Sequence, residues 1–271
     1  TVIYCGIVPT PTVQFMVHTS EAVGGFIITA SHNPIEWNGI KFLRSDSTFF
    51  HQEDCEKLFY LADNVSSIRK YSEERGMLWE EKNAIYKHTI KCSELKCINL
   101  DTIRGRKFKV VIDAVNGAGA NALPEMLNLL GCEVVKLDCE PSGVFKRGTE
   151  PLPVNLSELS KQVLENNADL GFAVDPDADR LAVVDEKGRP LGEEYTLVLS
   201  VDGYINTLGV ESDIFVSNLS TSIALDKLAL KNNCKVERSA VGEINVVNKM
   251  NKLDSNLGGE GNGGVILREC H

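Results

Sequence analysis

Apolar and polar positions along the chain predict short strands that alternate with amphipathic helices. The strands are apolar, β-branched runs that end at polar turns, and the helices repeat apolar residues every three or four positions. Strands are predicted at residues 1–4, 25–29, 40–43, 109–113, 133–137, 169–174, 181–184, 214–217, 235–238 and 265–267. Helices are predicted at residues 52–62, 79–93, 123–130, 156–166, 222–231 and 245–251, with Pro124 in the first turn of its helix and Gly131 just after it. Such alternation is typical of an α/β fold with largely parallel sheets.

The elements group into three consecutive α/β domains with mixed or parallel sheets. A chain of 271 residues is too long for one small core. A basic stretch at residues 104–107 and a new strand after Asp213 predict domains at residues 1–103, 104–210 and 211–271. The chain opens directly on a strand and without Met, so we expect residues to be missing before Thr1.

Composition and charge narrow the class of partner. Hydrophobic residues make up 43% and charged residues 24%, as in ordinary soluble proteins. No apolar run approaches the ~20 residues of a membrane span, and no export leader is visible. A net charge of −10 argues against a nucleic-acid partner. Eight cysteines without C-x-x-C pairs or a histidine cluster at zinc spacing predict reduced thiols in a cytoplasmic protein. The oligomeric state is left open.

Asp175-Pro-Asp-Ala-Asp-Arg180 joins two predicted strands and is the sharpest local feature. Its three carboxylates alternate along an extended segment and therefore project to one side. Such carboxylates repel one another unless a cation lies between them, and hard oxygen ligands suit Mg²⁺. We interpret Asp175, Asp177 and Asp179 as metal ligands, with a solvated acidic turn as the alternative.

Thr29-Ala-Ser-His-Asn-Pro34 follows a predicted strand, where ligand sites in α/β sheets form. Ser31 is a candidate nucleophile or phosphate carrier, and a plain turn is the alternative. A serine hydrolase is disfavoured because the G-x-S-x-G motif is absent and His32 directly follows Ser31.

Gly258-Gly-Glu-Gly-Asn-Gly-Gly264 surrounds one carboxylate with glycines. It contains a formal G-x-G-x-x-G motif, but a predicted strand follows it where a dinucleotide site needs a helix. Glycines let the backbone approach a polar ligand, and Glu260 can accept hydrogen bonds from hydroxyl groups. A flexible surface turn is the alternative.

Two other functions stay open at this point. Gly117-Ala-Gly-Ala-Asn-Ala122 follows a strand and opens a helix, and Asp138 ends the next strand. This is a weak form of the dinucleotide motif and would indicate an NAD-dependent oxidoreductase, although it leaves the three aspartates unexplained. The same loops could also belong to a sugar-phosphate binding module without catalysis.

Together, the three loops resemble the α-D-phosphohexomutase family of phosphomannomutases, phosphoglucomutases and phosphoglucosamine mutases. Residues 29–34 resemble its phosphoserine loop, residues 175–180 its metal loop and residues 259–264 its sugar-recognition loop. The order and wide separation of the motifs match over nearly the whole chain. Supporting stretches are residues 9–11, 38–41 and 148–153.

The resemblance implies an intramolecular phosphotransferase that interconverts hexose 6-phosphate and hexose 1-phosphate. Phosphorylated Ser31 would form a hexose bisphosphate, which would reorient and return its other phosphate to Ser31. Ser31, Asp175, Asp177 and Asp179 would hold Mg²⁺, and hexose 1,6-bisphosphate would be the activator.

The resemblance also implies residue roles around the substrate. Lys41 and Arg180 would stabilise charge on the transferring phosphate, and His32 would line the pocket. Glu243 is a candidate general base at a position where some members carry histidine. The expected sugar contacts are Glu260, Gly261 and Asn262.

Family members have four domains around a cleft, and the fourth grips the distal phosphate. We therefore expect the first and third domains to be incomplete and this chain alone to have little or no mutase turnover. Residues 241–247 and 259–264 look most like sequences of phosphoglucosamine or phosphomannose mutases. Phosphoglucosamine is the favoured substrate, and mannose and glucose phosphates remain open.

Overall fold

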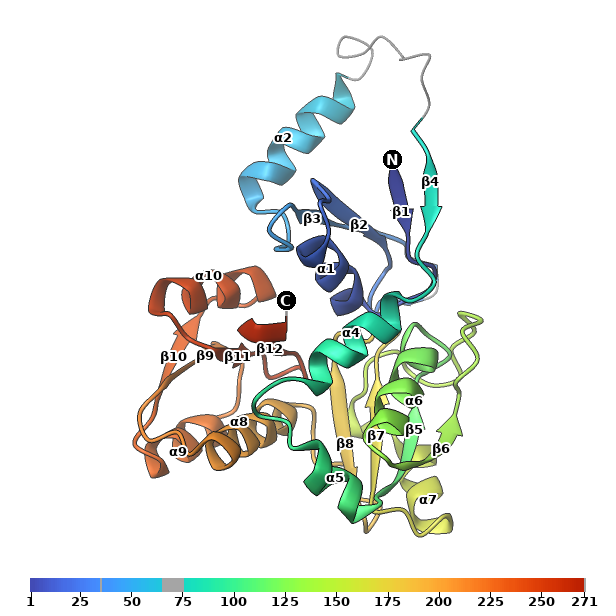
Figure 1. The fold of residues 1–271 in the computed structure, drawn as a ribbon, viewed down its shortest axis with the longest axis vertical. Coiled ribbons are helices and arrows are strands. Elements are labelled where there is room, and N and C mark those ends of the chain that lie inside the picture. Colours follow the sequence, from blue (N-terminus) through green and yellow to red (C-terminus); the bar gives the residue numbers. More distant parts are fainter. Residues whose placement is uncertain (35, 65–75, 271) are drawn as a thin grey trace.

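Three α/β units follow one another along the chain and meet around one helix, α4 (Ala84–Ser93) (Figure 1). The computed structural model describes residues 1–34, 36–64 and 76–270. Within these residues, no helix is both long enough and apolar enough to cross a membrane. The α/β class with mixed and parallel sheets is confirmed.

The first unit contains two small sheets. Its elements are β1 (Val2–Tyr4), α1 (Thr10–Thr19), β2 (Gly24–Ile28), β3 (Ile40–Arg44), α2 (Gln52–Asp63), β4 (Leu78–Glu80) and α4. β1 and β4 pair in parallel, whereas β2 and β3 form an antiparallel hairpin. Val17 of α1 packs on Ile27 and Leu43, which holds the helix against the hairpin. The hairpin therefore presents residues 29–34 as a supported segment after β2.

The second unit is one four-stranded sheet between helices. Its elements are α5 (Leu100–Arg106), β5 (Lys109–Asp113), α6 (Gly119–Leu129), β6 (Glu133–Leu137), η1 (Pro153–Asn155), α7 (Ser157–Glu165), β7 (Leu170–Val174) and β8 (Leu181–Asp185). Successive residues of a strand face opposite sides of its sheet. Val110 and Ile112 accordingly pack with Leu127 of α6, whereas Val111 packs with Leu159 of α7. Both faces of β5 are buried, which explains its continuous apolar run.

The third unit has the same plan. Its elements are α8 (Glu194–Leu208), β9 (Ile214–Asn218), α9 (Ala224–Lys231), β10 (Lys235–Ser239), α10 (Glu243–Leu253), β11 (Leu257–Gly259), β12 (Val265–Leu267) and η2 (Arg268–Cys270). Phe215 packs with Leu197 of α8 and Leu225 of α9, and Val216 packs with Val246 of α10.

The second and third units repeat one sheet topology. The strand orders are β6-β5-β7-β8 and β10-β9-β11-β12. In each sheet the strands therefore lie side by side in the order second, first, third and fourth of that unit's chain sequence. In both sheets the first three strands are parallel and the fourth is antiparallel. The loop between the third and fourth strands is residues 175–180 in one unit and residues 260–264 in the other. Two of the predicted chemical loops are therefore structurally equivalent.

Several sequence-based expectations are wrong. Residues 79–80 belong to β4 instead of a helix, because β1 offers them a parallel partner. Pro124 lies inside α6, since the helix begins at Gly119. The helices α1, α5 and α8 were not predicted. The buried positions of α8 are Leu197, Val201 and Ile205, which recur every four residues. β-branched residues and Gly203 lie among them and weaken this helical pattern in the sequence.

Candidate active site

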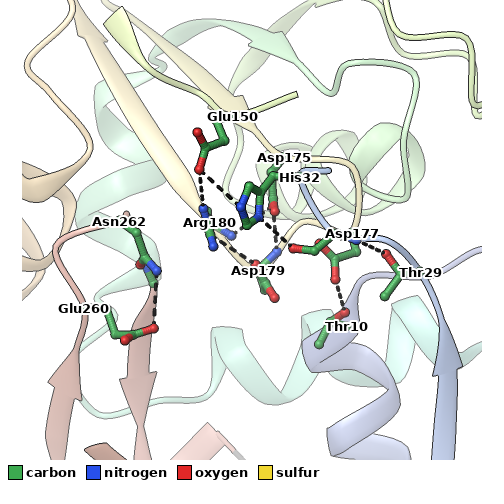
Figure 2. Close-up of polar contacts among 12 residues, drawn as sticks. Thr10, Thr29, His32, Glu150, Asp175, Asp177, Asp179, Arg180, Glu260 and Asn262 are labelled. Carbon is green, nitrogen blue, oxygen red and sulfur yellow. Dashed lines mark hydrogen bonds and ion pairs between the residues drawn. The ribbon is translucent and has the colours of Figure 1, made fainter. Parts of the chain in front are cut away.

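Loops from all three units line one cleft of about 810 Å³. Residues 29–39, 175–180 and 260–264 are each the connection of an antiparallel strand pair. Figure 2 shows Glu260 and Asn262 on one side of the cleft and Arg180 with the aspartates on the other. Predicted site residues that line the cleft are Ser31, Lys41, Asp179, Arg180, Glu243, Glu260 and Asn262.

The acidic loop, residues 175–180 between β7 and β8, brings its three carboxylates together in one cluster. Oxygens of Asp175, Asp177 and Asp179 lie within 4.8 Å of one another. Asp175 Oδ1 accepts hydrogen bonds from the backbone N–H groups of Asp179 at 3.1 Å and Arg180 at 3.2 Å. These bonds close the turn, in which Ala178 adopts a left-handed conformation with φ of 53°. The loop therefore has a fixed shape before any ligand binds.

The cluster fits a divalent cation. Asp175 and Asp177 are buried, and Asp175 Oδ2 and Asp177 Oδ1 have no hydrogen-bond partner. Burial, together with the charges of Asp179 and Asp177, raises the pKa of Asp175 well above its usual value. Unpartnered buried carboxylate oxygens are unfavourable unless they coordinate a cation. An all-oxygen set of this kind suits Mg²⁺.

Lys41 crosses from the first unit into this cluster. Its Nζ lies 2.7 Å from both Asp177 Oδ2 and Asp179 Oδ2. Burial would lower the pKa of Lys41, but the charges of Asp179 and Asp177 outweigh it and raise that pKa. Burial likewise opposes ionisation of Asp177, yet Lys41 and Thr10 hold its pKa below the usual value. Lys41 is thus a charged ammonium group between two carboxylates.

Thr10 makes a second link between the first and second units. Its backbone N–H donates to Asp177 O at 2.9 Å, and its hydroxyl donates to Asp177 Oδ2 at 2.8 Å. Pro9 and Pro11 flank it at the start of α1, where their missing N–H groups are not needed. Thr10 therefore fixes both the backbone and the side chain of Asp177.

Ser31 lies half-buried at the mouth of the cleft with φ of 52°. Its backbone N–H donates to Thr29 Oγ1 at 2.8 Å, which stabilises this left-handed turn. Its Oγ lies 3.2 Å from His32 Nδ1. The side chain is therefore accessible and has one hydrogen-bonding neighbour.

His32 and Arg180 share one carboxylate. Arg180 Nη1 donates to Glu150 Oε1 at 3.0 Å, and His32 Nε2 lies 3.4 Å from the same oxygen (Figure 2). Burial and the charge of Arg180 lower the pKa of His32, and Glu150 opposes this shift. Thr149 donates a hydrogen bond to the carbonyl oxygen of His32. The serine loop, residues 29–34, is therefore also anchored to the second unit.

Glu260 is oriented by hydrogen bonds to both of its oxygens. Its Oε1 accepts from Asn218 Nδ2 at 2.7 Å and from the Gly242 N–H at 2.9 Å. Its Oε2 accepts from Asn262 Nδ2 at 3.2 Å. At Gly261 an added Cβ would lie 2.9 Å from Thr221 Cα, so only glycine lets the loop pass this closely. The third unit thus offers a fixed carboxylate to the cleft.

Glu243 begins α10 at the edge of the cleft. Gln14 Nε2 donates to its Oε1 at 3.2 Å. Burial is the main cause that raises the pKa of Glu243 to about 7. A carboxyl group with this pKa can accept or donate a proton near neutral pH.

The glycine loop at residues 117–119 serves packing. Ala118 N–H donates to Pro176 O at 2.7 Å, and an added Cβ at Gly117 would lie 2.4 Å from that oxygen. The acidic loop therefore lies where a dinucleotide pyrophosphate would have to bind. Asp138, the expected ribose ligand, instead pairs with Lys146 at 2.5 Å. This geometry argues against an NAD-dependent oxidoreductase.

Sequence reasoning did not identify three polar residues of the site. Thr10 and Glu150 lie in stretches that were recognised as supporting motifs, but only the fold shows that they contact Asp177 and Arg180. Asn218 ends β9 and lies outside every recognised motif, so its place beside Glu260 had no signal beyond the end of a strand.

Comparisons with known proteins agree with this architecture. Residues 1–68, 86–188 and 192–271 match Phosphoglucomutase/phosphomannomutase, alpha/beta/alpha domains I, II and III. A phosphoglucomutase/phosphomannomutase of Thermococcus kodakarensis is 37% identical over 98% of this chain and 58% of its own length. A phosphoglucosamine mutase of Sulfurovum is 35% identical over 99% of this chain and 60% of its own.

A solved structure shows the same fold. It is a phosphoglucomutase/phosphomannomutase family protein of Burkholderia thailandensis with a TM-score of 0.81 and 21% identity. The match covers 100% of this chain and 58% of that one. The chain thus spans somewhat more than half the length of the relatives that it matches. On this extended similarity, the chain belongs to the phosphoglucomutase/phosphomannomutase family, the α-D-phosphohexomutases.

Proposed function

We propose that the protein is a phosphosugar mutase that interconverts hexose 6-phosphates and hexose 1-phosphates through phosphorylated Ser31. The observation that carries this proposal is the convergence of the serine loop, the acidic loop and the Glu260 loop on one cleft. Family membership supports it, because the matched relatives are phosphosugar mutases. A binding module without catalysis has no observation in its favour, whereas Lys41, Arg180 and Glu243 supply charge and a titratable carboxyl group at the cleft.

Asp175, Asp177 and Asp179 would hold Mg²⁺ together with an oxygen of Ser31. Their two unpartnered buried oxygens supply ligand positions that are already desolvated. A bound Mg²⁺ would neutralise charge on the phosphoryl group during its transfer.

In the first step a sugar hydroxyl attacks the phosphorus of phosphorylated Ser31. A P–O bond forms to the sugar, the P–O bond to Ser31 Oγ breaks, Ser31 Oγ takes up a proton from solvent to regenerate its hydroxyl, and the product is a hexose bisphosphate. The hydroxyl proton passes to Glu243, whose pKa of about 7 leaves a usable fraction of the base at neutral pH. Lys41 and Arg180 would stabilise the transferring phosphoryl oxygens. His32 does not line the cleft as expected and instead lies beside Arg180 at the shared carboxylate of Glu150.

In the second step the bisphosphate reorients and its other phosphate returns to Ser31. Glu260 and Asn262 would bind sugar hydroxyls in both orientations, because Glu260 is held from two sides by Asn218 and Gly242. The close approach at Gly261 keeps this loop in place. Hexose 1,6-bisphosphate would activate the protein by phosphorylating Ser31 initially.

The proposed substrate is glucosamine phosphate, and the proposed location is the cytoplasm. The matched Sulfurovum relative is a phosphoglucosamine mutase, whereas the Thermococcus relative is named for glucose and mannose phosphates. Steady-state kinetics with the 1-phosphates of glucosamine, mannose and glucose will decide among them. A higher kcat/KM for mannose or glucose phosphate would reject the preference for glucosamine.

The decisive test is phosphopeptide mapping of the full-length protein before and after incubation with Mg²⁺ and a hexose 1,6-bisphosphate. We expect phosphate on the peptide that contains Ser31, exchangeable with sugar phosphate, and none in Ser31→Ala. Ser47→Ala is the matched control, since Ser47 also has a left-handed backbone, with φ of 67°. Normal labelling in Ser31→Ala would remove Ser31 from the mechanism. An unmodified Ser31 in the native protein would leave the binding-module function.

A further inference from the structure

A second cluster of metal-ligating side chains lies at the same cleft but outside the acidic loop. Cys92 Sγ lies 3.0 Å from Cys270 Sγ, and Cys270 Sγ lies 3.7 Å from His88 Nε2. One ligand atom from each of the three residues lies within 4.8 Å of the others. All three side chains are half-buried and line the cleft.

The fold assembles this cluster from two distant segments. His88 and Cys92 are four residues apart on α4, so they share one helix face. Cys270 lies in η2 at the end of the third unit, 178 residues after Cys92. Figure 1 shows the end of the chain beside α4. The sequence showed no histidine cluster at zinc spacing, because the fold brings the third side chain of this group from so far along the chain.

The ring of His88 is held with one nitrogen toward the sulfurs. Its Nδ1 lies 3.0 Å from Thr12 Oγ1, and the ring stacks on Phe15 with centroids 5.1 Å apart. Histidines that ligate metals usually engage a second group through the other ring nitrogen. Thr12 and Phe15 provide this support before any ion binds.

The donor set and its spacing favour a soft or borderline cation. Two thiols and one imidazole are ligands for Zn²⁺ and unsuited to Mg²⁺. With metal–ligand bonds of about 2.0–2.3 Å, tetrahedral ligand atoms are ~3.5–3.8 Å apart. The separation of His88 Nε2 and Cys270 Sγ already matches, and the sulfurs must part by only about 0.8 Å. A disulfide would instead require them to approach by about 1 Å and would require an oxidant.

We propose that His88 Nε2 and the thiolates of Cys92 and Cys270 form a Zn²⁺ site separate from the Mg²⁺ cluster. Binding displaces two thiol protons to solvent, and a water from the cleft completes four-coordination. The ion joins α4 to the end of the third unit and thereby fixes one wall of the cleft.

The test is a titration of full-length, reduced and metal-free protein with Co²⁺ in saturating Mg²⁺. We expect a thiolate-to-cobalt charge-transfer band that ends at one equivalent and that Zn²⁺ removes. Cobalt bound by the carboxylates would give no such band. Cys92→Ser and His88→Gln should each weaken binding at least ~100-fold, and Thr12→Val by about 10–100-fold.

Cys55→Ser is the matched control, because Cys55 lines the same cleft but stands outside the cluster, and it should bind like the native protein. Far-ultraviolet circular dichroism checks that each variant is folded. Absence of the charge-transfer band, or equal affinity in folded Cys92→Ser, overturns the proposal. So does a disulfide between Cys92 and Cys270 that persists in glutathione at a cytosolic redox poise.

Discussion

Lys41 Nζ lies 2.7 Å from Asp177 Oδ2, although 136 residues separate them in sequence. The same ammonium lies 2.7 Å from Asp179 Oδ2. Lys41 thus engages two of the three carboxylates that we assign to a divalent cation. A metal ion held by these carboxylates would lie next to the Lys41 ammonium, and the two positive charges would repel each other. We therefore infer that Lys41 must leave the carboxylates when a metal binds.

Lys41→Met should therefore raise the affinity of the unphosphorylated protein for Mg²⁺ while it lowers phosphoryl transfer. We expect at least ~5-fold tighter binding, since ~1 kcal/mol of repulsion disappears. Isothermal titration calorimetry measures the affinity. Lys249→Met is the control, because Lys249 is a half-buried lysine paired with Glu237 in the third unit. Unchanged or weaker Mg²⁺ binding in Lys41→Met would contradict the competition.

Asp177→Asn should weaken Mg²⁺ dependence and activity together. The substitution removes one anionic ligand and also the charged partner of Lys41. We expect the Mg²⁺ concentration for half-maximal activity to rise at least ~10-fold, because charged oxygen ligands dominate binding of this cation. Asp185→Asn, at the other end of β8 and paired with Arg189, should titrate like the native protein. An unchanged titration in Asp177→Asn would reject the acidic loop as the metal site.

Glu243 should make stability depend on pH. Its pKa in the folded protein is about 7, above its usual value of 4.5. The folded state therefore holds this proton more tightly than the unfolded state does, and stability falls as pH rises from about 4.5 through 7. Glu243→Gln stays neutral, so its free energy of unfolding relative to native should improve by roughly 1–3 kcal/mol between pH 5 and 8.

Urea denaturation at both pH values measures this change. Glu186→Gln, which replaces an exposed carboxyl group, is the control variant. A pH-independent difference for Glu243→Gln would mean that Glu243 is not the proton acceptor proposed for catalysis.

Gly117→Ala should displace the acidic loop, because Gly117 packs directly against the backbone of Pro176. The added Cβ would lie 2.4 Å from Pro176 O, so the loop must shift. We expect a loss of about 1–3 kcal/mol in stability, as in other overpacked cores, together with weaker Mg²⁺ binding. Gly203→Ala is the control: Gly203 is an exposed position of α8 and nothing lies within 4 Å of its added Cβ, so the substitution should stabilise by about 0.5–1 kcal/mol. Thermal unfolding and Mg²⁺ titration of both variants distinguish local strain from a general effect of adding a methyl group.

The sequence identified candidate site residues best where they directly follow a predicted strand. Ser31 and Asp175 follow predicted apolar strands, and proximity to a strand end is a local property. Glu260 was indicated by its glycines, and the strand before it, β11 (Leu257–Gly259), was not predicted. Central strands such as β5 were predictable because burial on both faces produces an uninterrupted apolar run. The boundaries of the three domains between residues 103 and 104 and between residues 210 and 211 stay a prediction.

What the sequence could not provide was contact between segments that are distant along the chain. β4 looked helical until β1 supplied its partner, and neither strand alone carries that information. Thr10 and Cys270 likewise gain their significance from neighbours more than 150 residues away. Periodicity describes one element at a time, so it does not reveal which faces meet.

The second and third units repeat one sheet topology but present different chemical groups to the cleft. Thr10, Lys41 and Thr149 join the units that carry the serine loop and the acidic loop. The Glu260 loop belongs to the third unit, which has a core formed by its own helices and strands. A chimera that exchanges the third unit for that of a relative should inherit the donor's sugar preference and its residue at position 243, and keep the recipient's Ser31, Lys41 and metal ligands. Sugar specificity would then be inherited together with the proton acceptor, and separately from the phosphate carrier and its metal ligands.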